Sequence, residues 1–336
     1  MVVKDNPLLL RVENLRTYFE TASGTVKAVD GVTFSLNRGE TLGIVGESGS
    51  GKSVMSSSII RLLPPRTGVI KEGKIIFDGR EVLEMKNREV LALRGKEISM
   101  IFQDPMTSLD PVFKIGHQMV EMICEHSKHS REEASKMARD ALVKVGIPSP
   151  EHCLDSYPYE LSGGMCQRVI IAMAICSQPK LIIADEPTTA LDVTVQAQVL
   201  DLLKDMQKEY GTSLLLITHD LGVAWEMCHQ VMVMYAGNTV EFAETKELYA
   251  HPLHPYTWGL LSSIPRLSDA SKSLLHAIPG TPPDLRLTGR CCNFYNRCSY
   301  CLETCKRAVP PLVEVAEKHF VACHRQNGIN TLKRGE

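Results

Sequence analysis

Hydrophobic and polar positions alternate along residues 8–35, where β-branched residues are frequent. Alternation of this kind is typical of half-buried strands, so we expect antiparallel strands at this end of the chain. Short apolar runs bounded by glycine or polar residues follow, and they predict buried strands at 41–45, 74–77 and 98–102. A helix is expected over 51–62.

From residue 180 onward, strand and helix patterns alternate. We expect strands at 180–184, 213–218 and 231–235, and helices at 193–209 and 220–227. This order is typical of a parallel sheet covered by helices. Helical patterns at 115–147 and 162–177 interrupt it, and we interpret about 106–165 as an inserted helical subdomain.

The pattern changes near residue 250, where prolines and clustered cysteines break the long periodicity. We therefore predict one large domain over 1–250 and a C-terminal module over 251–336. No apolar run approaches the ~18 residues that would span a bilayer, and the N-terminus has no signal-peptide pattern. We expect a cytoplasmic chain that reaches a membrane only through partners. The formal net charge of -2 argues against a nucleic-acid partner.

A glycine-rich loop stands between the strand at 41–45 and the helix that follows. It fits the pattern G-x-x-x-x-G-K-[ST], whose backbone N–H groups and helix N-terminus bind phosphates. Lys52 would reach the β- and γ-phosphates, and the Ser53 hydroxyl would bind Mg²⁺. The predicted ATP-binding residues of this segment are Gly46, Glu47, Ser48, Gly49, Ser50, Gly51, Lys52, Ser53 and Val54.

Two acids end the apolar strand at 180–184. Asp185 can hold Mg²⁺ directly or through water, and Glu186 can polarise the water that attacks the γ-phosphate. A third motif, Leu161–Arg168, places Ser162 before Gly163 and Gly164 at a helix start. The serine caps the helix, and the bare backbone offers a second anion-binding terminus.

In their order and spacing these motifs resemble the ATP-binding-cassette family over about residues 8–245. Met165 stands where Gln is usual, and Cys166 where Arg is usual. The resemblance implies an α/β fold: a P-loop, RecA-like ATPase core with an antiparallel β edge, an inserted helical subdomain and a small cysteine-rich C-terminal module. It also implies that Ser162, Gly163 and Gly164 close over the ATP of a second subunit, with Asp192 in the loop that crosses to it.

Further residue roles come from the same resemblance. Gln103 would contact Mg²⁺ and the transporter, His219 the γ-phosphate, and Phe19 (or its neighbour Tyr18) the adenine ring. The implied catalytic residues are Glu186, His219, Lys52 and Gln103, and the implied Mg²⁺ ligands are Ser53, Gln103 and Asp185. Taken singly, Gln103 could be a surface residue, His219 a helix cap and Phe19 a core residue.

The segments Phe102–Pro111 and Ala184–Gln198 resemble dipeptide and oligopeptide importers, as do His254-Pro-Tyr-Thr and Ile278-Pro-Gly-Thr-Pro-Pro, to which we assign structural roles. This branch implies a peripheral ATPase at the cytoplasmic face of the cell membrane. Its partners would be two transmembrane permease subunits, a second related ATPase and an extracytoplasmic peptide-binding protein. Nickel or glutathione import stays open, as does a soluble cassette ATPase acting on nucleic acid or the ribosome. A metal-dependent redox sensor is a further alternative.

Six of the eleven cysteines crowd between Cys291 and Cys323. Cys292, Cys298, Cys305 and Cys323 are similar to a C-terminal pattern of this branch, in which some members hold a [4Fe-4S] cluster. Four thiolates suit such a cluster. Zinc remains a rival because Cys298, Cys301 and Cys305 have short spacings. Unligated thiols are a third possibility, whereas disulfides are not expected in a reducing compartment.

Overall fold

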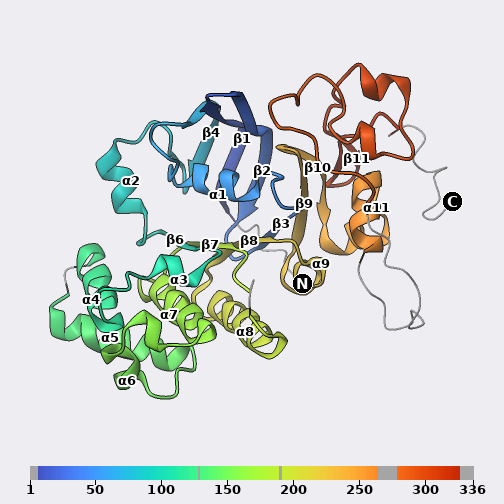
Figure 1. The fold of residues 1–336 in the computed structure, drawn as a ribbon. Coiled ribbons are helices and arrows are strands. Elements are labelled where there is room, and N and C mark those ends of the chain that lie inside the picture. The colour runs from blue at the N-terminus through green and yellow to red at the C-terminus, as the bar shows by residue number, and fades with distance from the viewer. Residues whose placement is uncertain (1–6, 128, 189–190, 264–277, 326–336) are drawn as a thin grey trace. The chain divides into compact units, whose positions relative to one another are not determined.

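The computed structural model describes residues 7–127, 129–188, 191–263 and 278–325 (Figure 1). The chain forms two compact units. The first consists of Met1–Pro7, Asn37–Glu40 and Glu84–Ile217, and the second of Leu8–Leu36, Thr41–Leu83 and Thr218–Glu336. The glycine-rich loop and the residues after 250 therefore belong to the same unit.

The second unit begins with a four-stranded sheet in the order β2-β1-β4-β5. Its strands are β1 (Leu8–Thr21), β2 (Gly24–Asn37), β4 (Gly68–Phe77) and β5 (Arg80–Glu81). β1 pairs antiparallel with β4, with Leu10 opposite Phe77 and Val12 opposite Ile75. All four side chains are fully buried. The alternation seen in the sequence thus reflects one apolar face of this sheet.

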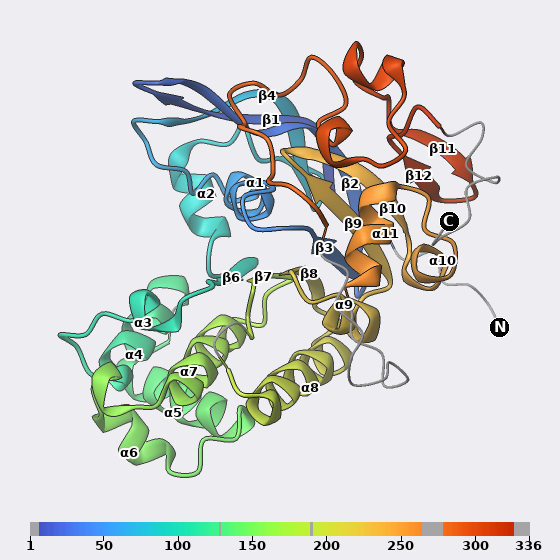
Figure 2. The same cartoon turned by 45° about the vertical axis from the view of Figure 1, so that its right-hand side comes forward.

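A second set of strands in this unit carries the glycine-rich loop. β3 (Thr41–Val45) runs parallel to β9 (Gln230–Tyr235), and β10 (Asn238–Glu244) pairs antiparallel with both β9 and β12 (His319–Val321). β11 (Val313–Ala316) completes the series beside β12 (Figure 2). The unit's helices are α1 (Lys52–Ile59), α9 (Leu221–Met227), α10 (Thr245–Ala250) and α11 (Pro255–Ser262).

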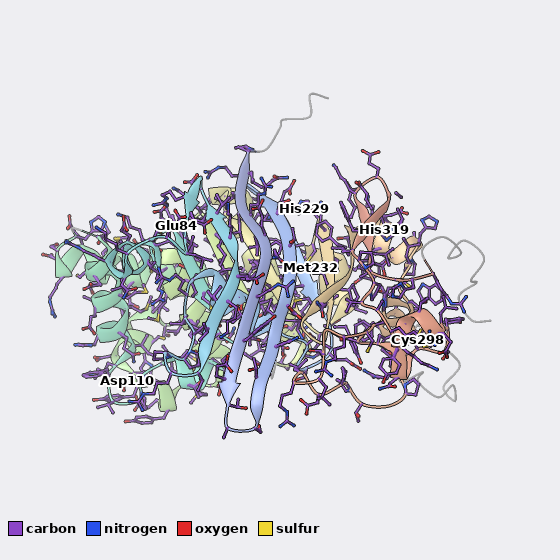
Figure 3. The ribbon with its side chains drawn as sticks, turned by 90° about the horizontal axis from the view of Figure 1, so that it is seen from above. Glu84, Asp110, His229, Met232, Cys298 and His319 are labelled. Atoms are coloured by element: carbon purple, nitrogen blue, oxygen red, sulfur yellow. The ribbon has the colours of Figure 1, made fainter. Side chains whose placement is uncertain are left out.

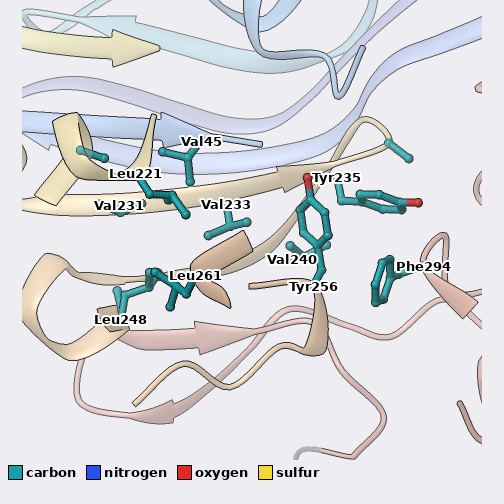
Figure 4. Close-up of a cluster of buried hydrophobic side chains, with 13 residues drawn as sticks. Val45, Leu221, Val231, Val233, Tyr235, Val240, Leu248, Tyr256, Leu261 and Phe294 are labelled. Atoms are coloured by element: carbon teal, nitrogen blue, oxygen red, sulfur yellow. The ribbon is translucent and has the colours of Figure 1, made fainter. Parts of the chain in front are cut away.

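One apolar core joins these strands to the C-terminal residues. Val45, Val233, Tyr235, Tyr256 and Phe294 all belong to it, and each is at most 4% exposed (Figure 4). Phe294 comes from residues 278–325, which we call the C-terminal segment. This segment is therefore packed into the same core as the strand that leads into the glycine-rich loop.

The first unit contains three parallel strands, with β7 (Leu181–Asp185) between β6 (Ile98–Ile101) and β8 (Ser213–Thr218). Every residue of β7 and β8 is buried, as expected for strands covered on both faces. The helices of this unit are α2 (Asn87–Leu93), α3 (Pro105–Ser108), α4 (Ile115–His126), α5 (Arg131–Lys144), α6 (Pro150–Asp155), α7 (Gly163–Cys176) and α8 (Val193–Tyr210). None of the described helices is long and apolar enough to cross a bilayer.

The strands and helices predicted between residues 41 and 235 are confirmed, with two differences. β4 begins at Gly68, before the strand predicted at 74–77, and the helical pattern over 115–147 is divided between α4 and α5. The sequence did not predict β10, β11 and β12, which are short or carry charges such as Glu241. The expected domain boundary near residue 250 does not coincide with a boundary between the two units, because residues on both sides of it share the core around Tyr256. That domain division and the separate C-terminal module stay predictions.

Candidate functional site

The glycine-rich loop lies in the second unit between β3 and α1. Its lysine is turned onto the loop itself: Lys52 Nζ donates to the carbonyl oxygens of Gly46 at 2.7 Å and Glu47 at 3.0 Å. Lys52 is only 5% exposed. The backbone of Gly51, which caps α1, is left-handed with φ 100°, and this geometry brings the N-terminus of α1 to the loop.

Two glycines of the loop are required by close packing. A Cβ on Gly46 would lie 2.2 Å from the Met234 carbonyl oxygen, and one on Gly51 would lie 2.1 Å from that of Ala28. Ser50 Oγ is buried and has no hydrogen-bond partner among the described residues. An unpartnered hydroxyl under a backbone cradle fits a loop built to receive an anion.

The remaining loop residues lie at the surface or just below it. Ser48, Gly49 and Ser53 are exposed, and Val54 is half-buried in α1. Glu47 is different, because its groups are bound by residues from far along the chain. Its N–H donates to Tyr256 Oη at 2.8 Å, and its carboxylate accepts from both Nη atoms of Arg297 at 2.6 and 2.9 Å. No sequence pattern predicted these contacts.

The two candidate adenine-stacking residues differ in their surroundings. Tyr18 Oη donates to Asp30 Oδ1 at 2.8 Å, and this hydrogen bond holds the tyrosine ring in place. Phe19 is half-buried, opposite Gly68 on β4. Of the two, Phe19 is the better candidate for stacking on a base. His219 comes directly after β8. It belongs to the second unit and is exposed.

Three predicted residues meet in the first unit at the ends of parallel strands. Gln103 Nε2, after β6, donates to Glu186 Oε2 at 3.0 Å, and Asp185, only 5% exposed, ends β7. Glu186 has φ 48°, a left-handed backbone that is costly for a residue with a side chain. Its N–H donates to the Ile217 carbonyl oxygen at 2.9 Å, which holds this turn in place.

The helix start predicted at Ser162 is confirmed. Ser162 Oγ accepts from the Met165 N–H at 3.3 Å, and both Ser162 and Gly163 are exposed. A Cβ on Gly164 would lie 3.3 Å from Val195 Cγ1 of α8. Asp192 caps α8 by accepting from the Val195 N–H at 3.0 Å. Residues 189–190, just before Asp192, lie outside the described residues.

Two other residues of α7 explain the local fold. Gln167 is buried, and its Nε2 donates to the Pro187 carbonyl oxygen at 2.7 Å, which joins α7 to the turn after Glu186. Cys166 is fully buried, and its thiol donates to the Pro158 carbonyl oxygen at 3.4 Å. A charged arginine at position 166 would have to leave this apolar site.

The predicted Mg²⁺ ligands Ser53, Gln103 and Asp185 supply a hydroxyl, an amide and a carboxylate oxygen. Hard oxygen donors of these kinds are what Mg²⁺ prefers, so the donor set fits the ion. Ser53 belongs to the second unit and the other two to the first.

The cysteines of the C-terminal segment fall into two groups. The backbone N–H groups of Phe294, Tyr300 and Arg325 lower the pKa of Cys292, Cys298 and Cys323, respectively, against the larger effect of burial, which raises it. Cys305 Sγ accepts from the Leu302 N–H at 3.4 Å. Cys301 differs, because its thiol donates to the Leu302 carbonyl oxygen at 3.4 Å.

Burial raises the pKa of Cys292 to about 12 and that of Cys298 to about 11, and the negative charges of neighbouring thiolates add to both shifts. For Cys292 these neighbours are Cys305, Cys298 and Cys323. None of the eleven cysteines is in a disulfide. No group of three or more His, Cys, Asp or Glu in the described parts of the chain is arranged to hold a metal ion. The iron–sulfur cluster is thus not confirmed and stays a prediction.

A buried polar cluster that the sequence did not reveal supports the segment around His254. Glu241 is fully buried and accepts from the N–H groups of Leu253 at 2.7 Å and His254 at 2.9 Å. His319 Nε2 lies 2.8 Å from Glu241 Oε1, the oxygen that also accepts from Leu253 (Figure 3 labels His319 and Cys298). The His254 side chain accepts from the Tyr256 N–H at 3.0 Å and so caps α11. The structural role expected for His254 is consistent with these bonds.

Comparisons with known proteins agree on one group of relatives. The sequence profile described as "ABC transporter" matches residues 29–189, and that described as "Oligopeptide/dipeptide transporter, C-terminal region" matches residues 240–305. The chain is 51% identical to the oligopeptide transport ATP-binding protein OppD of Bacillus subtilis over 93% of this chain and 87% of that protein. It is 47% identical to the dipeptide transport ATP-binding protein DppD of the same organism over 95% of each chain.

Solved structures show the same similarity. The dimeric ATP-binding cassette MJ0796 bound to ADP and Pi is 27% identical, with a TM-score of 0.64 over 70% of this chain and 99% of that chain. The structure of cbiO1 from Clostridium perfringens, part of the ABC transporter complex cbiONQ, is 31% identical, with a TM-score of 0.61 over 73% of this chain and 91% of that one.

Proposed function

Because this chain belongs to the ATP-binding-cassette family, within the group of oligopeptide and dipeptide transport ATP-binding proteins, we propose that it powers the import of peptides across a membrane. It is an ATPase, whose hydrolysis is coupled to transport. The observation that carries the peptide assignment is the match of residues 240–305 to the C-terminal region of peptide transporters. The names of the relatives reported above mention neither nickel nor glutathione. Those names also favour transport over an action on nucleic acid.

The proposed ATP site is built around the phosphate loop. Phe19 stacks on adenine, and Gly46–Ser53 with Val54 enclose the phosphates, with Lys52 turning from its own loop to the β- and γ-phosphates. Mg²⁺, held by Ser53, Gln103 and Asp185, would neutralise charge on the phosphates. Glu186 accepts a hydrogen bond from the attacking water, and His219 donates to the γ-phosphate.

The helix terminus at Ser162–Gly164 is exposed, and the ATP of the same subunit is proposed to bind at the phosphate loop. We propose that it closes over the ATP of a second cassette subunit and that Asp192 lies in the loop that crosses to that subunit. Support comes from the dimeric state of the similar cassette MJ0796. In a peptide importer the second cassette would be a related ATPase.

The remaining partners follow from this role. Two permease subunits would form the path through the membrane, and a peptide-binding protein would deliver the substrate on the other side. The chain would then lie peripherally at the cytoplasmic face. Phe102 and Met106, both exposed near Gln103, offer apolar contacts to a permease.

For the cysteines of the C-terminal segment we propose that Cys292, Cys298, Cys305 and Cys323 hold a [4Fe-4S] cluster. The Leu302 N–H donates to Cys305 Sγ, and nearby backbone N–H groups lower the pKa of the Cys292, Cys298 and Cys323 thiols. Such groups stabilise thiolates and tune cluster potentials. The cluster would hold together a segment with little apolar core of its own.

Anaerobic purification followed by iron, sulfide and zinc analysis tests the cluster. We expect about four iron and four sulfide per chain, and their loss in Cys292→Ser. The matched control is Cys291→Ser, which should keep them. Bound zinc, or a chain without metal, would overturn this assignment without affecting the ATPase.

The transport function is tested by trapping. Glu186→Gln should hold ATP without hydrolysing it and so preserve the closed assembly in detergent-solubilised membranes. We expect two multispanning proteins and a second cassette subunit to co-purify, with the assembly lost in Glu186→Gln combined with Lys52→Ala. Co-purification of soluble proteins alone would contradict the role in import.

A further inference from the structure

Glu47 is a residue of the phosphate loop that the C-terminal half of the second unit holds by hydrogen bonds. Its N–H donates to Tyr256 Oη at 2.8 Å, and its carboxylate forms a two-bond pair with Arg297, at 2.6 and 2.9 Å. Tyr256 is on α11 and Arg297 lies 250 residues after Glu47. One loop residue is thus held at both its backbone and its side chain by distant parts of the chain.

Arg297 is itself firmly placed. Its side chain is 4% exposed, and Nε donates to the Pro279 carbonyl oxygen at 2.9 Å while Nη2 donates to that of Ile278 at 3.3 Å. Its guanidinium carbon lies 5.8 Å from the centre of the Tyr235 ring. The hydrogen bond to Glu47 raises the pKa of Arg297, which stays charged. A planar guanidinium fixed in this way imposes its geometry on the carboxylate that it binds.

The pair with Arg297 matters for phosphate binding because it fixes where Glu47 lies. The Glu47 carbonyl oxygen also accepts from Lys52 Nζ at 3.0 Å, so a shift of Glu47 moves the contact that orients the loop lysine.

We propose that Arg297 and Tyr256 are positioning residues for ATP binding, which hold the phosphate loop in its receptive shape through Glu47. The proposal rests on the ATP site described above. Because Arg297 directly precedes Cys298, the loop also depends on the fold of the cysteine-bearing segment. Neither residue touches the nucleotide; both act through Glu47.

The test measures ATP affinity by calorimetry and thermal stability without nucleotide, on the full-length protein. Arg297→Met and Glu47→Gln should each weaken ATP binding about tenfold, because each removes a charge-assisted pair. Glu47→Gln should also lower the unfolding temperature, since it leaves a buried guanidinium without its carboxylate. Tyr256→Phe should also weaken ATP binding, because it removes the hydroxyl that accepts from the Glu47 N–H.

The double variant Glu47→Gln/Arg297→Met separates positioning from a merely structural role. Removing both charges should restore stability relative to Glu47→Gln, whereas ATP binding should stay as weak as in either single variant. Recovery of ATP affinity together with stability would overturn the proposal, as would unchanged affinity in the single variants.

Arg286→Met is the matched control, because Arg286 forms an exposed pair with Asp284 in the same segment. It should bind ATP like the wild type. If the wild type and this control both fail to bind ATP, the proposed ATP site itself is wrong, which is a different result from selective weakening in the Arg297 and Glu47 variants.

Discussion

Glu186 combines a left-handed backbone (φ 48°) with a hydrogen bond from Gln103 to its carboxylate. Side chains held in such unfavourable backbone geometry are often positioned for chemistry. Here the turn ends a fully buried strand, so that the acid directly after Asp185 is presented at the end of β7 rather than within it.

Replacing Glu186 with Gln should reduce ATP hydrolysis by about 100-fold or more, since general-base assistance is lost. ATP affinity should be unchanged, because the amide oxygen can still accept from Gln103. Phosphate release and nucleotide titration measure the two effects. Normal hydrolysis in this variant would show that Glu186 does not act as the general base.

Thiol reactivity provides a second test at the scale of single residues. Burial raises the pKa of Cys153 to about 11 and that of Cys176 to about 12. Both remain neutral thiols at pH 8, so iodoacetamide should leave them unmodified in the folded protein and label them after unfolding. Mass spectrometry of the labelled peptides reads the result, and rapid labelling of Cys153 in the folded state would contradict its burial.

At the scale of elements, several helices begin with a side chain that accepts a backbone N–H. Ser162 begins α7, Asp192 begins α8, Asp220 begins α9 and His254 begins α11. The first three caps could be expected from residue type alone. His254 could not, because histidine caps helices only when it is neutral and its acceptor nitrogen is correctly turned.

His254 should make stability depend on pH. Burial lowers its pKa from 6.5 to about 3, so the folded protein keeps the ring neutral while the unfolded chain protonates it. The stability present above pH 6.5 is lost as the pH falls toward 3, by about 2 kcal/mol at pH 5. Denaturant unfolding at pH 7.5 and 5 should show this loss, and His254→Asn, which keeps a cap acceptor, should show about 2 kcal/mol less of it. An equal loss in both proteins would contradict the assignment.

Local patterns thus predicted the strands, the capped helices and the glycine-rich loop, because each is specified by residues close together in sequence. Contacts between distant segments were not predictable in this way. Glu241 looked like an ordinary charge within an unremarkable stretch, and only the structure shows its carboxylate bound by His319, 78 residues later. Arg297 likewise carried no pattern that would connect it with Glu47.

At the scale of the whole molecule, the stability of the second unit depends on the buried Glu241 carboxylate. His319→Leu would remove one donor from a fully buried group, and we expect a loss of about 3 kcal/mol in the free energy of unfolding. The control is His251→Leu, whose side chain is 71% exposed beside Glu247 and should change stability little. Chemical denaturation measures both. Equal stability of the two variants would show that the Glu241–His319 contact contributes nothing.

The donors that bind the Glu241 carboxylate are synthesised at different times during translation. Leu253 and His254, 12 and 13 residues after Glu241, leave the ribosome soon after it, but His319 follows 78 residues behind. At about 5–20 residues per second, the newborn chain waits roughly 4–16 s for its last donor. During that interval Glu241 of β10 lacks its contact with His319 of β12. The second unit is therefore completed late in translation, although its phosphate loop is among the first residues made.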